Sequence, residues 1–245
     1  MLIKDVAICL RAVDYSETSQ ILTFFSRDNG KFAAIAKGSK RPKSKFDGPF
    51  EIFTLGRIVF ADSQKQKLAT VTEFEQSNSF SQLRKNLFSL NCAYLADELL
   101  CKLTEDFDPH VSLFDSLLQC LNNLSQAEKN SDILKFLICF QLDLLKQTGL
   151  EPLIDRCANC KKPFSAEWSE TYFSSSANGL ICRDCENSFT QKIKIKTTAA
   201  AALADFDNLR CANAETVVEI EKIIVKHFTY ILNQQLKSAK YVLRL

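Results

Sequence analysis

The hydrophobic pattern of this chain changes near residue 76, and this change limits the possible folds more than any other feature. Before it, short segments rich in Val, Ile, Phe and Thr alternate with turn signals such as Asp28-Asn29-Gly30 and Asp47-Gly48-Pro49. After it, Leu83, Leu87 and Leu90 begin a pattern with helical spacing. Separate strand-forming and helix-forming parts are typical of an α+β protein. We place the domain boundary between residues 76 and 77.

The first part predicts a small closed sheet. Strands are expected at five places along residues 1–76, separated by turns that include Asn29-Gly30 and Asp62-Ser63. The expected strands are 3–12, 19–25, 32–37, 50–60 and 67–74. Five short strands suit a barrel better than a sandwich, which usually needs about seven strands and about 100 residues.

The second part, residues 77–245, predicts a helical domain with an insertion. Residues 77–150 favour three helices, two of them at 111–124 and 132–148, with Ser131 or Asp132 as N-cap and Gly149 ending the last one. A short helix at 199–204 and an amphipathic helix at 214–236 follow. Residues 151–190 differ from both sides, because they contain four of the ten cysteines and the single tryptophan.

Two Cys-x-x-Cys pairs lie in this insertion, Cys157 with Cys160 and Cys182 with Cys185. Each such turn directs two sulfur atoms at one ion, and two turns complete a tetrahedral structural Zn²⁺ site without an open position for water. Two disulfides or four free thiols are the alternatives. The remaining six cysteines sit in apolar patterns and are expected to be core thiols.

Nothing in the sequence indicates export or membrane insertion. Lys4 and Asp5 interrupt the first apolar stretch, and no run approaches the ~20 apolar residues that span a bilayer. We therefore expect the reducing cytoplasm, where zinc binding is favoured over disulfides.

The formal net charge of +2 excludes a bulk polycation, so nucleic-acid binding would have to rest on local clusters. The segment 37–45 is such a cluster, with five basic side chains and no acid: Lys37, Lys40, Arg41, Lys43 and Lys45. Gly38, Ser39 and Pro42 make it a loop, whose cations could meet phosphates, with Phe24, Phe32 and Phe46 as possible stacking faces. The alternative is a solvated loop that aids solubility. The C-terminal residues 191–245 are a second basic region, with 9 basic and 5 acidic side chains.

Catalytic motifs are missing from the sequence. The two histidines, His110 and His227, have no Ser or Cys partner motif nearby, and no Gly-rich phosphate loop, dinucleotide fingerprint or His-Glu-x-x-His pattern occurs. We therefore expect a protein that is not an enzyme, with a metal-dependent nuclease or hydrolase as a rival class.

Two groups of motifs together resemble a known family. Val13-Asp-Tyr15-Ser-Glu17-Thr-Ser19, Gly30 and Ala36-Lys37-Gly38-Ser39-Lys40-Arg41-Pro42-Lys43 look like the N-terminal domain of the bacterial recombination mediator family RecO. Gly149-Leu150-Glu151-Pro152-Leu153, followed by the two cysteine pairs, is similar to the zinc segment of the same family. Tyr15 and Glu17 match the motif, although a structural role in the barrel would explain them equally well.

The resemblance implies an N-terminal five-stranded OB fold at 1–76 and a helical domain at 77–245 with an inserted zinc module at about 151–190. It implies a non-enzymatic DNA repair and recombination mediator that binds single- and double-stranded DNA and anneals complementary strands. The implied partners are RecR, the C-terminal tail of the single-stranded DNA-binding protein and, functionally, RecA. The implied location is the bacterial cytoplasm at the nucleoid, and the five cations of segment 37–45 become the best candidates for phosphate contact. A zinc-stabilised protein–protein adaptor without DNA binding is the alternative function.

Overall fold

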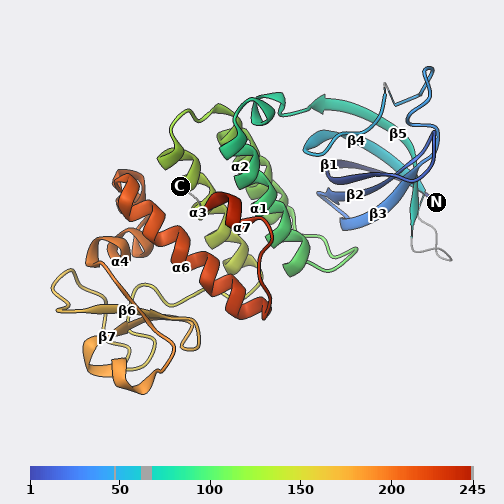
Figure 1. Cartoon of the computed structure of the whole chain (residues 1–245). Helices are drawn as coiled ribbons and strands as arrows, with labels where there is room; N and C mark the ends of the chain where they lie inside the picture. The colour runs from blue at the N-terminus through green and yellow to red at the C-terminus, as the bar shows by residue number, and fades with distance from the viewer. Residues whose placement is uncertain (47, 62–67, 244–245) are drawn as a thin grey trace. The chain divides into compact units, whose positions relative to one another are not determined.

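A computed structural model describes residues 1–46, 48–61 and 68–243, and Figure 1 shows the whole chain. Its described residues divide into two compact units, one of residues 1–85 and 100–125 and one of residues 86–99 and 126–245. The first unit contains a closed five-stranded barrel, with the strands in the order β1-β2-β3-β5-β4. The strands are β1 (Leu2–Asp14), β2 (Gln20–Ser26), β3 (Gly30–Ala36), β4 (Thr54–Ala61) and β5 (Ala69–Asn78). This confirms the α+β class and the OB-like barrel.

Alternating side chains build the barrel core. Leu22 and Phe24 of β2 point inward opposite Ala34 and Phe32 of β3, and all four are fully buried. The turn between β2 and β3 ends at Asn29, and Gly30, the first residue of β3, has a positive φ of 70°, which agrees with the predicted turn at Asn29-Gly30. The predicted turns at Asp47 and at Asp62-Ser63 fall on residues outside the described ranges.

Lys31 holds the β2–β3 hairpin to the end of a helix. The helix α1 (Leu87–Leu103) ends beside the hairpin, and Lys31 Nζ donates hydrogen bonds to the carbonyls of Cys101 (2.8 Å) and Thr104 (2.7 Å). The positive charge of Lys31 also interacts favourably with the negative C-terminal end of the helix dipole. The next helix, α2 (Val111–Gln126), packs Phe114 on Phe25 with ring centroids 6.0 Å apart. The predicted helix at 111–124 is therefore confirmed, and it shields one end of the outer face of β2.

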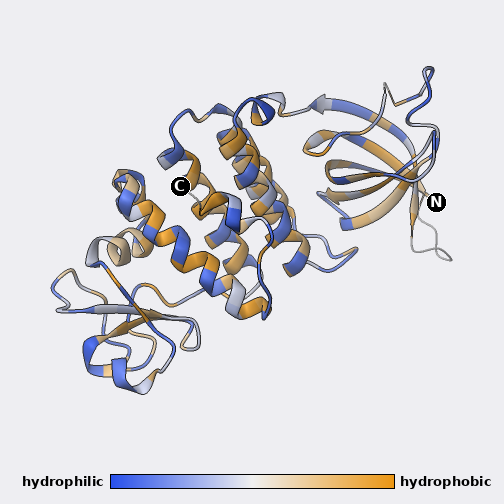
Figure 2. Ribbon diagram, viewed as in Figure 1, coloured by the Kyte–Doolittle hydropathy of each residue, from blue (hydrophilic) through white to orange (hydrophobic). Residues whose placement is uncertain are grey.

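The second unit has a core between two long helices, α3 (Asn130–Gln147) and α6 (Ala214–Leu232). Polar and apolar residues lie on different sides of α6 (Figure 2). Gly149 follows α3 with φ 74°, as predicted. The N-cap prediction was wrong: Lys129 is the N-cap, because its carbonyl accepts the first helical hydrogen bonds, while Asp132 lies in the first turn.

A small three-stranded sheet, in the order β7-β6-β8, occupies the cysteine-rich insertion. The other elements of the described chain are mostly short helices. The remaining elements are η1 (Ser81–Lys85), β6 (Thr171–Ser174), β7 (Gly179–Cys182), η2 (Arg183–Ser188), β8 (Ile193–Ile195), α4 (Thr197–Ala204), α5 (Phe206–Cys211) and α7 (Ala239–Val242). The sheet packs on α4 and α6 through Phe173, Ala200 and Ile223. None of the described helices has the length and apolar character needed to cross a membrane.

Candidate metal centre and nucleic-acid interface

Two local turns carry the four cysteines of the insertion. The first is closed by backbone hydrogen bonds from Lys161 to Cys157 and from Cys157 to Lys162, with Lys161 in the left-handed region at φ 64°. The second begins where β7 ends at Cys182 and continues into η2, which contains Cys185. Backbone hydrogen bonds join Leu180 to Leu153 and Ala158 to Leu180, and thereby place the first turn against β7.

Gly179 allows this close approach. A Cβ atom at Gly179 would lie 2.3 Å from the carbonyl oxygen of Leu153, and its φ of +155° also disfavours other residues. The strand carrying Cys182 and the segment leading to Cys157 can therefore run side by side.

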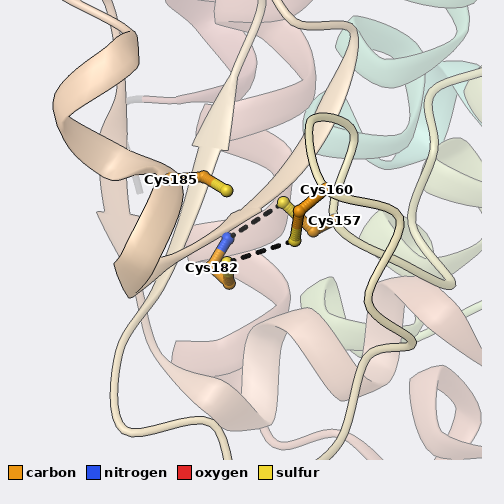
Figure 3. A group of neighbouring side chains, drawn as sticks. All are labelled: Cys157, Cys160, Cys182 and Cys185. Carbon is orange, nitrogen blue, oxygen red and sulfur yellow. Dashed lines mark hydrogen bonds between the residues drawn. The ribbon is translucent and has the colours of Figure 1, made fainter.

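The four sulfur atoms converge on one point, as Figure 3 shows. They all lie within 4.8 Å of one another, and the sulfurs of Cys160 and Cys182 are 3.7 Å apart. A tetrahedral ion with metal–sulfur distances of about 2.3 Å requires sulfur–sulfur distances of about 3.8 Å. A disulfide needs a sulfur–sulfur distance of about 2.05 Å, and Cys157, Cys160, Cys182 and Cys185 form no disulfide. The donor set thus fits a four-thiolate metal ion, and it does not form the two disulfides weighed above.

The thiol pKa values differ within the cluster. Burial raises the pKa of Cys157, but backbone N–H groups of Cys182, Cys160 and Asn159 outweigh burial and lower this pKa to about 7. The Cys182 N–H to Cys157 sulfur contact is 3.5 Å (Figure 3). Burial, followed by the hydrogen bond with Cys185, raises the pKa of Cys182 to about 12. Adjacent thiolates repel one another, so ionising all four requires a cation among them.

The basic loop, residues 37–45, leaves the barrel after β3 and is fixed at its base. Gln20 of β2 contacts the chain near both ends of the loop. Its Oε1 accepts hydrogen bonds from Ser39 Oγ (3.0 Å) and from Phe50 N (2.8 Å). Lys40 N donates to Thr18 O (3.1 Å), and Lys40 Nζ pairs with Asp14 (2.5 Å). The loop is therefore attached to β1 and to the β1–β2 turn, a contact that no local sequence pattern indicates.

The predicted phosphate-contacting side chains differ in exposure. Lys37, Arg41, Lys43 and Lys45 are exposed, whereas Lys40 is half-buried beside Asp14. Among the described residues, no acid pairs with the four exposed cations. The structure thus presents a basic loop, and its contact with DNA stays a prediction.

The predicted stacking faces were wrong. Phe24 and Phe32 are fully buried in the barrel, and Phe46 is only 7% exposed in the same core. Strand alternation turns Phe24 and Phe32 inward, where they pack on each other, and the rings of Phe24 and Phe46 both pack on Phe50. Tyr15, in the β1–β2 turn, is instead 64% exposed.

Three lysines at the start of the C-terminal basic region are already paired. Lys192, Lys194 and Lys196, on and beside β8, form ion pairs with Glu186, Glu170 and Glu215. His227 is buried on α6, and His110 contacts Asp108. The two histidines lie in separate units. Neither joins a nucleophile in the described residues.

Comparison with known proteins defines the class first: the family models that match are those of a recombination protein. The model described as recombination protein O, N terminal, matches residues 1–80, and the model described as recombination protein O, C terminal, matches residues 84–240. This chain belongs to the RecO family. It is 30% identical over 249 residues to the DNA repair protein RecO of Bacillus pumilus and also to that of Bacillus subtilis, in each case across 99% of this chain and 94% of the relative. A protein of the same name from Rhodopirellula baltica is 30% identical over 200 residues, across 82% of this chain and 73% of that protein.

Proposed function

We propose that this chain is a non-enzymatic DNA repair and recombination mediator. Membership of the RecO family, whose relatives are named DNA repair proteins, supports the repair role. In this proposal the chain binds single- and double-stranded DNA and anneals complementary strands. With RecR, it helps to load RecA onto DNA that is covered by the single-stranded DNA-binding protein.

The exposed cations of the basic loop are the observation that carries the DNA-binding part. Gln20 fixes the base of the loop through Ser39 and Phe50, and the side chains of the four cations are exposed to solvent. Cations of this kind bind phosphates and release counterions, without reading the sequence of bases. Annealing then needs no covalent chemistry, since neutralised backbones approach while their bases remain free to pair.

We infer that the four-cysteine cluster holds one structural Zn²⁺. Cys157, Cys160, Cys182 and Cys185 would bind it, and bound zinc would supply folding energy to the module. Four thiolates leave no position for a reacting water, which supports a role outside catalysis. Metal analysis of the purified protein should find about one zinc ion per chain.

The partners and the location follow from the same family membership. RecR would be one partner, and the acidic C-terminal tail of the single-stranded DNA-binding protein would bind a basic and apolar pocket on the helical domain. The location would be the bacterial cytoplasm at the nucleoid. We also propose that residues 1–76 and 77–245 are the two domains, with the zinc module at about 151–190.

Fluorescence anisotropy of labelled single-stranded DNA across a salt series tests DNA binding by the loop. The variant Lys37→Ala/Arg41→Ala/Lys43→Ala removes three exposed cations and keeps Lys40, which pairs with Asp14. If the four exposed cations neutralise four phosphates, log K falls with log salt with a slope of about −2.8, and removing three of these cations reduces the slope to about −0.7. We expect weaker and less salt-dependent binding by this variant.

The control variant is Lys146→Ala/Lys222→Ala/Lys226→Ala, which removes the same charge from exposed positions on α3 and α6. It should bind like the wild type. Equal binding by the loop variant and weaker binding by the control would move the DNA site to the helical domain. A wild type that binds no DNA would favour the adaptor function, and cleavage of the DNA with divalent metal would favour the nuclease.

A further inference from the structure

The outer face of β1, β2 and β3 is covered at one end and open at the other. At the covered end, Phe25 contacts Phe114 and Arg27 pairs with Asp115 at 2.9 Å, both partners lying on α2. At the open end, strand register places Val13 opposite Ile21, and Ile21 opposite Ile35. Val13 is 44% exposed, and both isoleucines are partly exposed. The three side chains form an apolar row about 10 Å long, given the spacing of about 4.8 Å between strands.

Tyr15 stands beside this row. It lies two residues after Val13, beyond the last residue of β1, in a turn closed by the hydrogen bond from Tyr15 N to Ser19 O (2.9 Å). Tyr15 is 64% exposed, and its hydroxyl has no hydrogen-bond partner among the described residues. An exposed tyrosine with a fixed backbone and no internal partner is available to a ligand.

Cations border the row and the tyrosine. Arg11 is exposed two residues before Val13, and Lys37 is exposed two residues after Ile35. The basic loop is attached to the same turn, since Lys40 binds Thr18 and Asp14, and Gly38 N donates to Ser19 Oγ (3.4 Å). Phosphates held by the loop would bring the attached bases over the apolar row.

We propose that Tyr15 and the row of Val13, Ile21 and Ile35 form a platform for the unpaired bases of single-stranded nucleic acid. The inference rests on the proposed DNA binding and deepens it, because it gives the basic loop a preference for single strands. Bases stack on aromatic rings regardless of their identity, so the platform is tolerant of sequence. Paired bases in a duplex are stacked on each other and cannot lie on the ring.

The test measures binding of the full-length protein to three probes: a short oligothymidylate, the same sugar–phosphate chain without bases, and a duplex of equal length. Tyr15→Ala should weaken binding to the oligothymidylate by at least about fivefold, the low end for loss of one stacked base. Its affinity for the other two probes should equal that of the wild type. The salt slope should also stay the same, because tyrosine carries no charge.

Two further variants make the test specific. Tyr15→Phe keeps the ring and should bind like the wild type. Tyr230→Ala removes a tyrosine of similar exposure (48%) from α6 and should have no effect. Wild-type binding of oligothymidylate by Tyr15→Ala, or an equal loss on all three probes, overturns the platform while leaving DNA binding by the loop intact. Failure of the wild type to bind any probe would instead refute the proposed function.

Discussion

Replacing Glu221 with Gln should stabilise this protein at neutral pH and have little effect near pH 4.5. Glu221 is fully buried on α6, and its Oε1 accepts a hydrogen bond from Gln141 Nε2 of α3 (3.0 Å). Its Oε2, and Oε1 of Gln141, have no partner among the described residues. Burial raises the pKa of Glu221 from 4.5 to about 7, although the hydrogen bond from Gln141 opposes this rise.

The size of the effect follows from the two pKa values. Between pH 4.5 and about 7 the folded protein keeps the Glu221 proton, whereas the unfolded chain loses it. The free energy of unfolding therefore falls by about 1.4 kcal/mol for each pH unit, and by about 3 kcal/mol in all. The contribution of the protonated Glu221 to the free energy of unfolding is complete below pH 4.5 and is lost as the pH rises to about 7. Glutamine does not titrate, so the variant avoids this loss.

His227, on the same helix, titrates in the opposite sense. Burial lowers its pKa from 6.5 to about 4, and both ring nitrogens are buried without a partner in the described chain. Below pH 6.5 the unfolded chain binds a proton at His227, whereas the folded protein does not until the pH approaches 4. The free energy of unfolding therefore falls as the pH is lowered through this range. The two slopes cancel between pH 4.5 and 6.5 in the wild type. In His227→Phe, the free energy of unfolding should therefore fall with rising pH because of Glu221 alone. In Glu221→Gln, it should rise with rising pH because of His227 alone.

Urea denaturation followed by far-ultraviolet circular dichroism, at constant ionic strength and several pH values, measures both slopes. Because the variants share every other titrating group with the wild type, the differences in unfolding free energy isolate the two residues. For Glu221→Gln the difference should grow from near zero at pH 4.5 to about 3 kcal/mol above pH 7. For His227→Phe, the advantage over the wild type should grow as the pH falls. A difference that is independent of pH would refute this reasoning for the residue concerned.

Two further substitutions test the hydrogen bonds of Lys31 and the four-cysteine site. Lys31→Met removes the hydrogen bonds to the carbonyls at the end of α1 and should lower the unfolding free energy by about 1–3 kcal/mol, measured by urea denaturation. Lys43→Met, an exposed control, should change it little, and equal stabilities of the two variants would contradict the assignment. Cys185→Ser should lose zinc by metal analysis and change the fluorescence of Trp168, the single tryptophan, which is buried in the same module. Cys211→Ser, outside the cluster, is the control; full zinc retention by Cys185→Ser would count against the site.

Local spacing made most of the architecture predictable from the sequence. Alternating apolar residues indicated the five strands, and the two Cys-x-x-Cys pairs indicated a four-sulfur cluster, because both signals lie within short stretches. The strands β6, β7 and β8 were not predicted. They have four residues or fewer, too short for a pattern, and β6 and β7 are buried on both faces.

Contacts between residues that are distant in the sequence could not be predicted from local patterns. Gln20 meets Phe50, 30 positions away, and Gln141 meets Glu221, 80 positions away. Nothing near Gln20 or Glu221 indicates these partners. The buried position of Phe24, however, is predictable from the sequence. The alternation of Leu22 with Phe24 already assigns Phe24 to the inner face, and Ile21 to the outer one.

The pairing of cations explains why the barrel loop is the stronger candidate for phosphate contact. Charge counts alone favour the C-terminal residues 191–245, with a net +4 against +3 for residues 1–80. Around β8, however, lysines are bound to glutamates of the same unit, so a phosphate would have to displace a carboxylate there. In the basic loop, Lys40 alone has an acidic partner among the described residues. Because the salt dependence of binding reflects cations that meet phosphates, the loop should contribute the larger part of the slope despite its smaller net charge.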